Sequence, residues 1–194
     1  MRAAKPSHSV RLPNRRLWPA LALAITLSCA GVAPAPESRA TTSSLQPTSF
    51  GLTATVDEVV DGDTIIVAVD GRSETVRLLG IDTPEKAGGP RPAECFGDEA
   101  TAYASQLLPR GSTVLLSRDR ESRDQYGRLL AYVFRADDQL FVNLAMVRGG
   151  FATALFFAPN TTFERDFERA ANQARRDWQG FWPTCGAPDV TLAG

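Results

Sequence analysis

A β-hairpin between residues 64 and 79 is the feature of the sequence that most restricts the fold. Thr64–Val69 is an unbroken run of β-branched and apolar residues, as expected of a buried strand. Asp70-Gly71 follows, a dipeptide that favours a tight two-residue turn, and Ser73–Leu79 returns as the partner strand. The hairpin brings Asp63 close to Arg77, with the register open by one residue. Charged side chains from two separate segments therefore meet at one end of the sheet.

Further strands and helices are predicted around this hairpin. The residue patterns indicate three more strands (Thr53–Val60, Thr113–Ser117, Leu129–Arg135) and helices at Gly97–Leu108, at Val142–Arg148 and from an N-cap at Thr162 to about Trp178, with a loop at 80–94. Three strands, a helix, two strands and then helices is an order that suits a small barrel of OB type. We therefore predict an α+β, mainly β fold, a five-stranded OB-fold barrel with three helices.

The first thirty residues have the layout of a secretory signal. Five basic residues and no acidic one accompany an apolar run at 17–27, which small residues at 28–31 follow. Ser28-Cys29-Ala30 fits a cleavage site before Gly31, Cys29 is also a candidate for lipidation, and an uncleaved membrane anchor is the third alternative. We assign 1–30 to a signal peptide or lipoprotein signal, 31–50 to a flexible linker, 51–185 to the folded domain and 186–194 to a disordered tail.

The chain that follows this signal is acidic and contains no histidine. From Gly31 onward 16 basic residues face 22 acidic ones, a net charge of −6, and His8 lies before that point. Catalysis by Ser-His-Asp or Cys-His arrangements and histidine metal sites are therefore excluded. The chemistry must come from carboxylates, arginines, hydroxyls or a hard metal ion, and affinity for nucleic acid cannot rest on a basic surface.

Two cysteines, Cys95 and Cys185, remain beyond the N-terminal segment. Outside the cytoplasm such a pair favours a disulfide, and two free buried thiols are the alternative. We predict the bridge, which ties the loop before the first helix to the C-terminal tail.

Three short motifs carry the candidate chemistry. They are Asp61-Gly-Asp63-Thr, the stretch from Arg77 to Glu85, and Tyr126-Gly-Arg128. Alone, each is more often a turn or a surface charge than a functional site. The hairpin, however, gathers Asp63, Arg77 and Asp82, and like carboxylates that lie close together favour a cation between them. An all-oxygen site of this kind selects a hard ion, calcium or magnesium.

The ordered motifs resemble the staphylococcal nuclease (thermonuclease) family. The similarity runs from residue 52 to 182 and rests on Asp61-Gly-Asp63-Thr64, Arg77-Leu-Leu-Gly-Ile-Asp82-Thr83-Pro-Glu85, Tyr126-Gly-Arg128-Leu-Leu-Ala-Tyr and residues 143–150, 159–160 and 181–182. The resemblance implies an SNase-like domain that acts as a calcium-dependent endonuclease. Such an enzyme hydrolyses phosphodiester bonds of DNA and RNA and leaves 3′-phosphates.

The resemblance also implies roles for single residues. Calcium would be bound by Asp63, Asp82 and the carbonyl of Thr83, with Asp61 near the ion. Glu85 would be the general base for the attacking water, and Arg77 and Arg128 would bind the phosphate. Tyr126 and Phe157 are candidate substrate-binding residues, although Leu155 and Phe157 stand where the family's type member has tyrosines near the nucleotide.

Two other interpretations compete with the nuclease. One is an OB-type module that binds nucleic acid or a protein without cutting, and the other is a structural domain of a surface lipoprotein. The complete set of catalytic and metal residues favours the nuclease. We expect a monomer that is secreted, periplasmic or on the cell surface and that acts on DNA and RNA, single-stranded or denatured in preference. Membrane contact is expected only through lipidation at Cys29.

Overall fold

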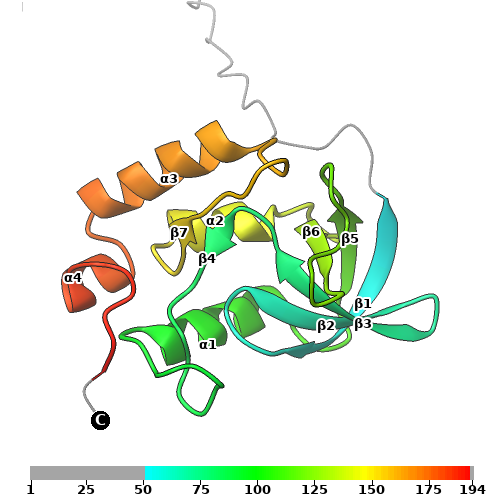
Figure 1. The fold of residues 1–194 in the computed structure, drawn as a ribbon, viewed down its shortest axis with the longest axis horizontal. Coiled ribbons are helices and arrows are strands. Elements are labelled where there is room, and N and C mark those ends of the chain that lie inside the picture. The colour runs from blue at the N-terminus through cyan, green and yellow to red at the C-terminus, as the bar shows by residue number, and fades with distance from the viewer. Residues whose placement is uncertain (1–50, 193–194) are drawn as a thin grey trace, which may run out of the picture. The chain divides into compact units, whose positions relative to one another are not determined.

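Five strands form a closed barrel in this computed structural model, which describes residues 51–192 (Figure 1). The barrel order is β1–β2–β3–β6–β5, made of β1 (Leu52–Val59), β2 (Thr64–Val69), β3 (Arg72–Leu78), β6 (Leu129–Arg135) and β5 (Thr113–Ser117). The helices are α1 (Gly97–Leu107), α2 (Val142–Arg148), α3 (Glu164–Arg176) and α4 (Phe181–Cys185). The predicted five-stranded barrel is confirmed. The predicted signal, the linker and Cys29 lie outside the described residues.

The structure also corrects several predicted elements. Within the segment predicted as a loop, β4 (Ile81–Asp82) pairs with β7 (Thr153–Ala154), and α4 is a fourth helix where three were predicted. The N-cap predicted at Thr162 is wrong, because α3 begins at Glu164 and the Thr162 hydroxyl donates to Asp119 at 2.9 Å. The bond to the charged Asp119 carboxylate is stronger than the bond that the hydroxyl would accept from a backbone N–H as an N-cap. None of the helices described is long and apolar enough to cross a membrane.

The hairpin register brings the charged residues together. Thr64 lies opposite Arg77, and the N–H of Leu78 donates to the carbonyl of Asp63 at 2.8 Å. Asp63 therefore lies opposite Leu78, which resolves the register that the sequence left open. β3 also pairs in parallel with β6, with Arg77 opposite Leu130. Residues that end β3 and residues that begin β6 consequently share one end of the barrel.

A sharp turn at Gly80 carries the chain from β3 into β4. Gly80 has a φ of 78°, and a Cβ there would lie 2.5 Å from a ring carbon of Phe167 and 2.7 Å from one of Phe156. Only glycine fits this conformation and this space. Asn143 of α2 holds the turn by donating to the Leu79 carbonyl at 2.9 Å. The turn thereby sets the position of Asp82 on β4.

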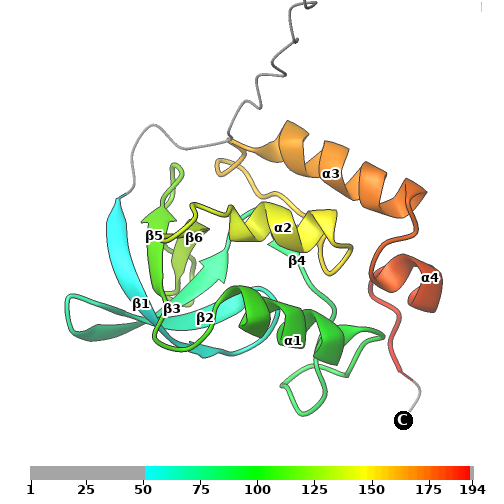
Figure 2. The same cartoon turned by 180° about the vertical axis from the view of Figure 1, so that it is seen from behind.

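An aromatic cluster joins the barrel to α3. Phe167 on α3 is fully buried, with its ring centroid 5.4 Å from that of Phe141, and Tyr132 of β6 meets Phe163 edge-to-face at 4.7 Å. Figures 1 and 2 show α1, α2 and α3 stacked along one side of the barrel, with α2 in the middle. Because Phe167 also packs beside Gly80, the cluster supports the turn that leads to Asp82.

The predicted disulfide is present between Cys95 and Cys185. It joins the residue just before the N-cap of α1 to the last residue of α4, across a sequence separation of 90 residues. Closing a loop of that length removes unfolded-state entropy worth about 4.6 kcal/mol in the chain-entropy model.

The aromatic cluster makes a direct prediction for stability. Phe167→Ala should lower the free energy of unfolding by about 3–5 kcal/mol, because it removes a fully buried ring and leaves a cavity. Phe157→Ala is the matched control, since that ring is 72% exposed and its loss should change stability by less than about 0.5 kcal/mol. Chemical denaturation of both variants measures the difference, and equal losses would contradict the described core.

Candidate active site

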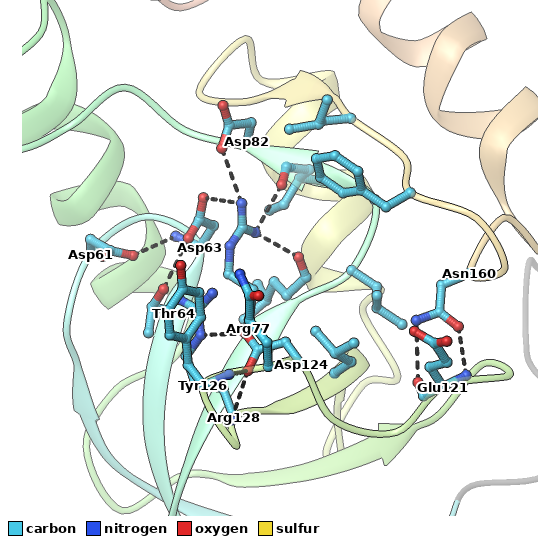
Figure 3. A pocket seen from close by; sticks show the side chains of 18 of the residues that line it. Asp61, Asp63, Thr64, Arg77, Asp82, Glu121, Asp124, Tyr126, Arg128 and Asn160 are labelled. Atoms are coloured by element: carbon cyan, nitrogen blue, oxygen red, sulfur yellow. Dashed lines mark hydrogen bonds and ion pairs between the residues drawn. The ribbon is translucent and has the colours of Figure 1, made fainter.

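A single pocket of about 1120 Å³ collects most of the predicted site residues (Figure 3). It lies where β2 begins and β3 ends. The turn that leads into β6 borders it. Its walls include eight of the residues singled out in the sequence, namely Asp61, Asp63, Arg77, Asp82, Glu85, Tyr126, Arg128 and Phe157. Thr83 is buried beside the pocket and does not line it. Segments that are far apart in the sequence thus share one cavity.

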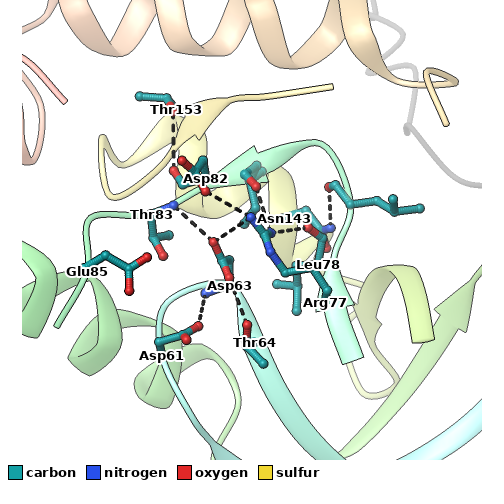
Figure 4. A network of polar contacts seen from close by, with 12 residues as sticks. Asp61, Asp63, Thr64, Arg77, Leu78, Asp82, Thr83, Glu85, Asn143 and Thr153 are labelled. Carbon is teal, nitrogen blue, oxygen red and sulfur yellow. Dashed lines mark hydrogen bonds and ion pairs between the residues drawn. The ribbon is translucent and has the colours of Figure 1, made fainter. Parts of the chain in front are cut away.

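Arg77 lies between the two aspartates (Figure 4). Its Nη2 contacts Oδ2 of Asp63 at 2.9 Å and Oδ1 of Asp82 at 3.0 Å. Its Nη1 donates to the carbonyls of Leu78 at 2.8 Å and Ile81 at 2.9 Å. Four acceptors therefore fix the guanidinium, which explains how a charged side chain is accommodated in an otherwise apolar strand.

Asp63 is the most buried acid of the pocket, with 5% of its surface exposed. Burial raises the pKa of its carboxyl to about 6; Arg77 opposes the shift, and the charges of Asp61 and Asp82 add to it. The backbone N–H of Thr83 donates to Oδ2 of Asp63 at 3.2 Å. One guanidinium therefore only partly compensates the negative charge that gathers at this point.

Glu85 reaches the pocket from the loop that follows β4. Its carboxylate forms an ion pair with Arg91, which lies further along the same loop. Burial raises the pKa of Glu85, and Arg91 opposes the shift while Asp61, Glu94 and Asp82 add to it. The pairing with Arg91 was missed from the sequence, because a glycine- and proline-rich loop has no periodicity that predicts such a contact.

Arg128 lies on the turn before β6 and is paired with Asp124. Its Nε donates to Oδ2 of Asp124 at 2.7 Å, and Oδ1 of Asp124 accepts the backbone N–H groups of Tyr126 and Arg128, both at 3.0 Å. The Tyr126 side chain is 75% exposed, and the guanidinium of Arg128 lies 5.6 Å from its ring centroid. Asp124 was missed from the sequence, although an aspartate three residues before Gly127 is a recognisable turn signal.

The carboxylates are suited to a hard cation. In residues 51–192 no three histidine, cysteine or acidic side chains already surround a metal position, since Arg77 occupies the space between Asp63 and Asp82. The donors nevertheless fit calcium or magnesium, because all are oxygens and the charges of Asp61 and Asp82 act unfavourably on ionised Asp63. A cation there would compensate charge that Arg77 compensates only in part.

Comparisons with known proteins agree with this arrangement of barrel, carboxylates and arginines. The model of the family described as "Staphylococcal nuclease homologue" matches residues 75–184. The matched region includes Arg77, Asp82, Glu85 and Arg128. The chain belongs to the staphylococcal nuclease family.

Individual relatives carry nuclease names. Over 127 residues the chain is 39% identical to "Thermonuclease" of Staphylococcus intermedius, covering 66% of this chain and 74% of the relative. It is 35% identical over 127 residues to "Thermonuclease" of Staphylococcus hyicus, covering 66% and 73% of the two chains. "Endonuclease YncB" of Bacillus subtilis (strain 168) is 35% identical over 136 residues, with 68% and 62% covered.

The buried Asp63 makes a prediction for stability against pH. In the folded protein its pKa is raised from 3.8 to about 6, so ionisation of Asp63 costs nothing below pH 3.8 and destabilises the fold fully above pH 6. Asp63→Asn should therefore raise the free energy of unfolding at pH 7 in chelator, by roughly 2–3 kcal/mol. The asparagine can still accept from Thr83 and donate to the hydroxyl of Thr64, which lies 3.0 Å from Oδ1 of Asp63.

Thermal unfolding in chelator between pH 4 and 8 measures this effect. The gain in Tm should be small at pH 4, should grow as the pH rises toward 6 and should level off above that. Asp70→Asn is the control, because Asp70 is exposed in the hairpin turn and asparagine suits the same backbone conformation. A gain that is equal at pH 4 and pH 7 would show that Asp63 is not the group responsible.

Proposed function

We propose that this nuclease is an exported, calcium-dependent endonuclease that hydrolyses phosphodiester bonds of DNA and RNA to give 3′-phosphate products. The observation that carries the proposal is the Asp63–Arg77–Asp82 contact in the same pocket as Glu85 and Arg128. Acidic groups for a cation, a carboxylate for water and guanidiniums for phosphate are the components that phosphodiester hydrolysis requires. The names of the relatives support the same reaction.

Calcium would be held by Asp63, Asp82 and the backbone carbonyl of Thr83, with Asp61 next to them. When bound, the ion supplies positive charge that offsets the phosphodiester charge and polarises the phosphoryl oxygen. The Nη2 of Arg77, which contacts both carboxylates, is the donor that would turn to a phosphate oxygen if a cation took its place. Nη1 would stay bound to the main chain.

Glu85 is the proposed general base. In its ionised form it takes a proton from the water that attacks phosphorus, a contribution of about 10²–10⁴-fold in rate. Arg77 from β3 and Arg128 from the turn before β6 bind the phosphate oxygens and stabilise the charge of the five-coordinate phosphorus. Breaking the bond to the 5′-oxygen leaves the phosphate on the 3′ side.

Two exposed aromatic rings favour unpaired strands as the substrate. Tyr126 and Phe157 line the pocket and are 75% and 72% exposed. Aromatic faces stack on unpaired bases of any sequence, by about 1–3 kcal/mol per base, whereas paired bases are stacked on each other. The acidic chain offers little general attraction to phosphates, so binding depends on the cation, the arginines and these rings.

Export as a monomer completes the proposal. The Cys95–Cys185 disulfide is stable in oxidising surroundings outside the cytoplasm, which fits the secretory layout of the first thirty residues. A secreted, periplasmic or cell-surface location follows, with membrane attachment only where Cys29 is lipidated.

Calcium dependence and the role of Glu85 are tested in one digestion assay. Purified protein should degrade denatured DNA and RNA with added calcium and lose that activity in excess chelator. Glu85→Gln should lower kcat by about 10²-fold or more, because the amide cannot take the proton from water. Glu168→Gln, the same change on an exposed face of α3, should keep wild-type kcat. Digestion that persists unchanged in chelator would refute the metal mechanism.

The geometry of the Arg77 fork is tested separately. Arg77→Lys keeps the positive charge and loses the planar pair of donors that reaches two carboxylates and two carbonyls. We expect kcat/KM to fall by about 10²–10³-fold while circular dichroism stays unchanged. Arg72→Lys, at the exposed start of β3, is the control and should retain activity. Near-normal kcat/KM in Arg77→Lys would mean that charge alone is sufficient at this position.

A further inference from the structure

Glu85 is bound through its main chain to one residue that the proposed mechanism does not use, Glu94. The backbone N–H of Glu85 donates to Oε2 of Glu94 at 3.0 Å. The backbone N–H of Glu94 donates to the carbonyl of Glu85 at 2.8 Å. Both main-chain polar groups of Glu85 are thus bound by Glu94. Glu94 therefore fixes the main-chain position from which the Glu85 side chain reaches the pocket, where its carboxylate pairs with Arg91.

The start of α1 packs directly against the main chain of Glu85. A Cβ at Gly97 would lie 2.0 Å from the carbonyl oxygen of Glu85 and 2.8 Å from the backbone nitrogen of Lys86. The helix backbone therefore contacts the backbone of Glu85 with no side chain between them. Any displacement of residues 94–97 consequently displaces Glu85 as well.

The C-terminal segment fixes the residues around Glu94. Residues 190–192 pair in antiparallel fashion with residues 93–95, through two backbone hydrogen bonds of 2.8 and 2.9 Å. The Cys95–Cys185 disulfide fastens the same place covalently. Figure 1 shows the segment after α4 lying beside the loop that precedes α1. Part of the segment predicted as a tail at 186–194 thus has main-chain partners at residues 93–95.

This attachment matters because the residues of the pocket differ in how they are supported. Asp63 and Arg77 belong to the hairpin of the barrel, and Asp82 lies on β4, which pairs with β7. Glu85 instead begins a loop without helix or strand that contains Gly88, Gly89, Pro90 and Pro92. A misplacement of about 1 Å of a reacting group can cost 10²-fold in rate. The base therefore requires support that the barrel does not supply.

We propose that residues 185–192 and the Cys95–Cys185 disulfide form a brace that positions Glu85 through Glu94. The inference rests on the proposed function, since it makes Glu94 a positioning residue for the base named there. Turnover is full only in enzyme whose disulfide is closed and whose tail is docked. Cation binding depends mainly on other elements, because Asp63 lies in the hairpin and Asp82 on β4.

The link through Glu94 is tested with two variants at one position. Glu94→Ala removes the acceptor of the Glu85 N–H and should lower kcat by about tenfold or more, with KM and the calcium requirement within about twofold of wild type. Glu94→Gln keeps an acceptor oxygen and should restore most of kcat. A general loss of stability would not produce that rescue. An alanine variant with wild-type kcat, or a glutamine variant as slow as alanine, would overturn the assignment.

The brace itself is tested from both of its ends. Cys95→Ser/Cys185→Ser opens the disulfide, and a chain that stops after Gly186 removes the tail and keeps the disulfide. Both are assayed at a temperature where circular dichroism shows them folded. Each should lose about five- to tenfold in kcat and retain the calcium-induced rise in Tm. Wild-type kcat in both folded variants would overturn the brace, whereas absence of calcium-dependent cleavage by the wild-type protein would overturn the proposed function.

Discussion

The contact between Arg77 and the two aspartates is the interaction on which the rest of the site depends. A single nitrogen, Nη2, lies within 3.0 Å of both Asp63 and Asp82. The hairpin register supplies the first carboxylate, and the turn at Gly80 supplies the second. Neither would lie there if the strands slipped by one residue, since a slip of one turns every side chain to the opposite face. The register of the barrel and the turn at Gly80 therefore position Asp63, Arg77 and Asp82 relative to one another.

That arrangement works against stability. A buried carboxylate whose pKa is raised to about 6 is harder to ionise in the folded chain than in the unfolded one. The charges of Asp61 and Asp82 add to the cost, and Arg77 recovers only part of it. The fold offsets this with interactions elsewhere, namely the aromatic cluster around Phe167 and a disulfide that spans 90 residues. Unfavourable burial of charge, offset by interactions elsewhere in the fold, is typical of functional sites.

The sequence was sufficient for the parts of the fold that local rules control. An unbroken apolar run and Asp70-Gly71 were enough to predict the hairpin, and with it the meeting of Asp63 and Arg77. Local rules could not predict β4, because two residues have no periodicity and their pairing depends on β7 some seventy residues away. The N-cap assigned to Thr162 failed for a similar reason. Its hydroxyl binds Asp119, a distant residue that no local pattern reveals.

The same limit applies within the site. The residues expected to act on the substrate were found from short motifs, and all of them except Thr83 line one pocket. The side chains that hold those residues in place were missed, because Asp124, Arg91 and Glu94 act through contacts that tertiary structure creates.

The two kinds of support differ in one physical respect. Asp63 and Arg77 gain their positions from a barrel whose strands are hydrogen-bonded on both sides, so their geometry is as stable as the fold. Glu85 gains its position from a loop, a hydrogen-bonded partner and a tail, which can open locally while the barrel stays intact. In the proposed mechanism, the cation ligands and the general base are consequently supported by different parts of the chain. A covalent bond near Glu94 limits the local opening that would move Glu85.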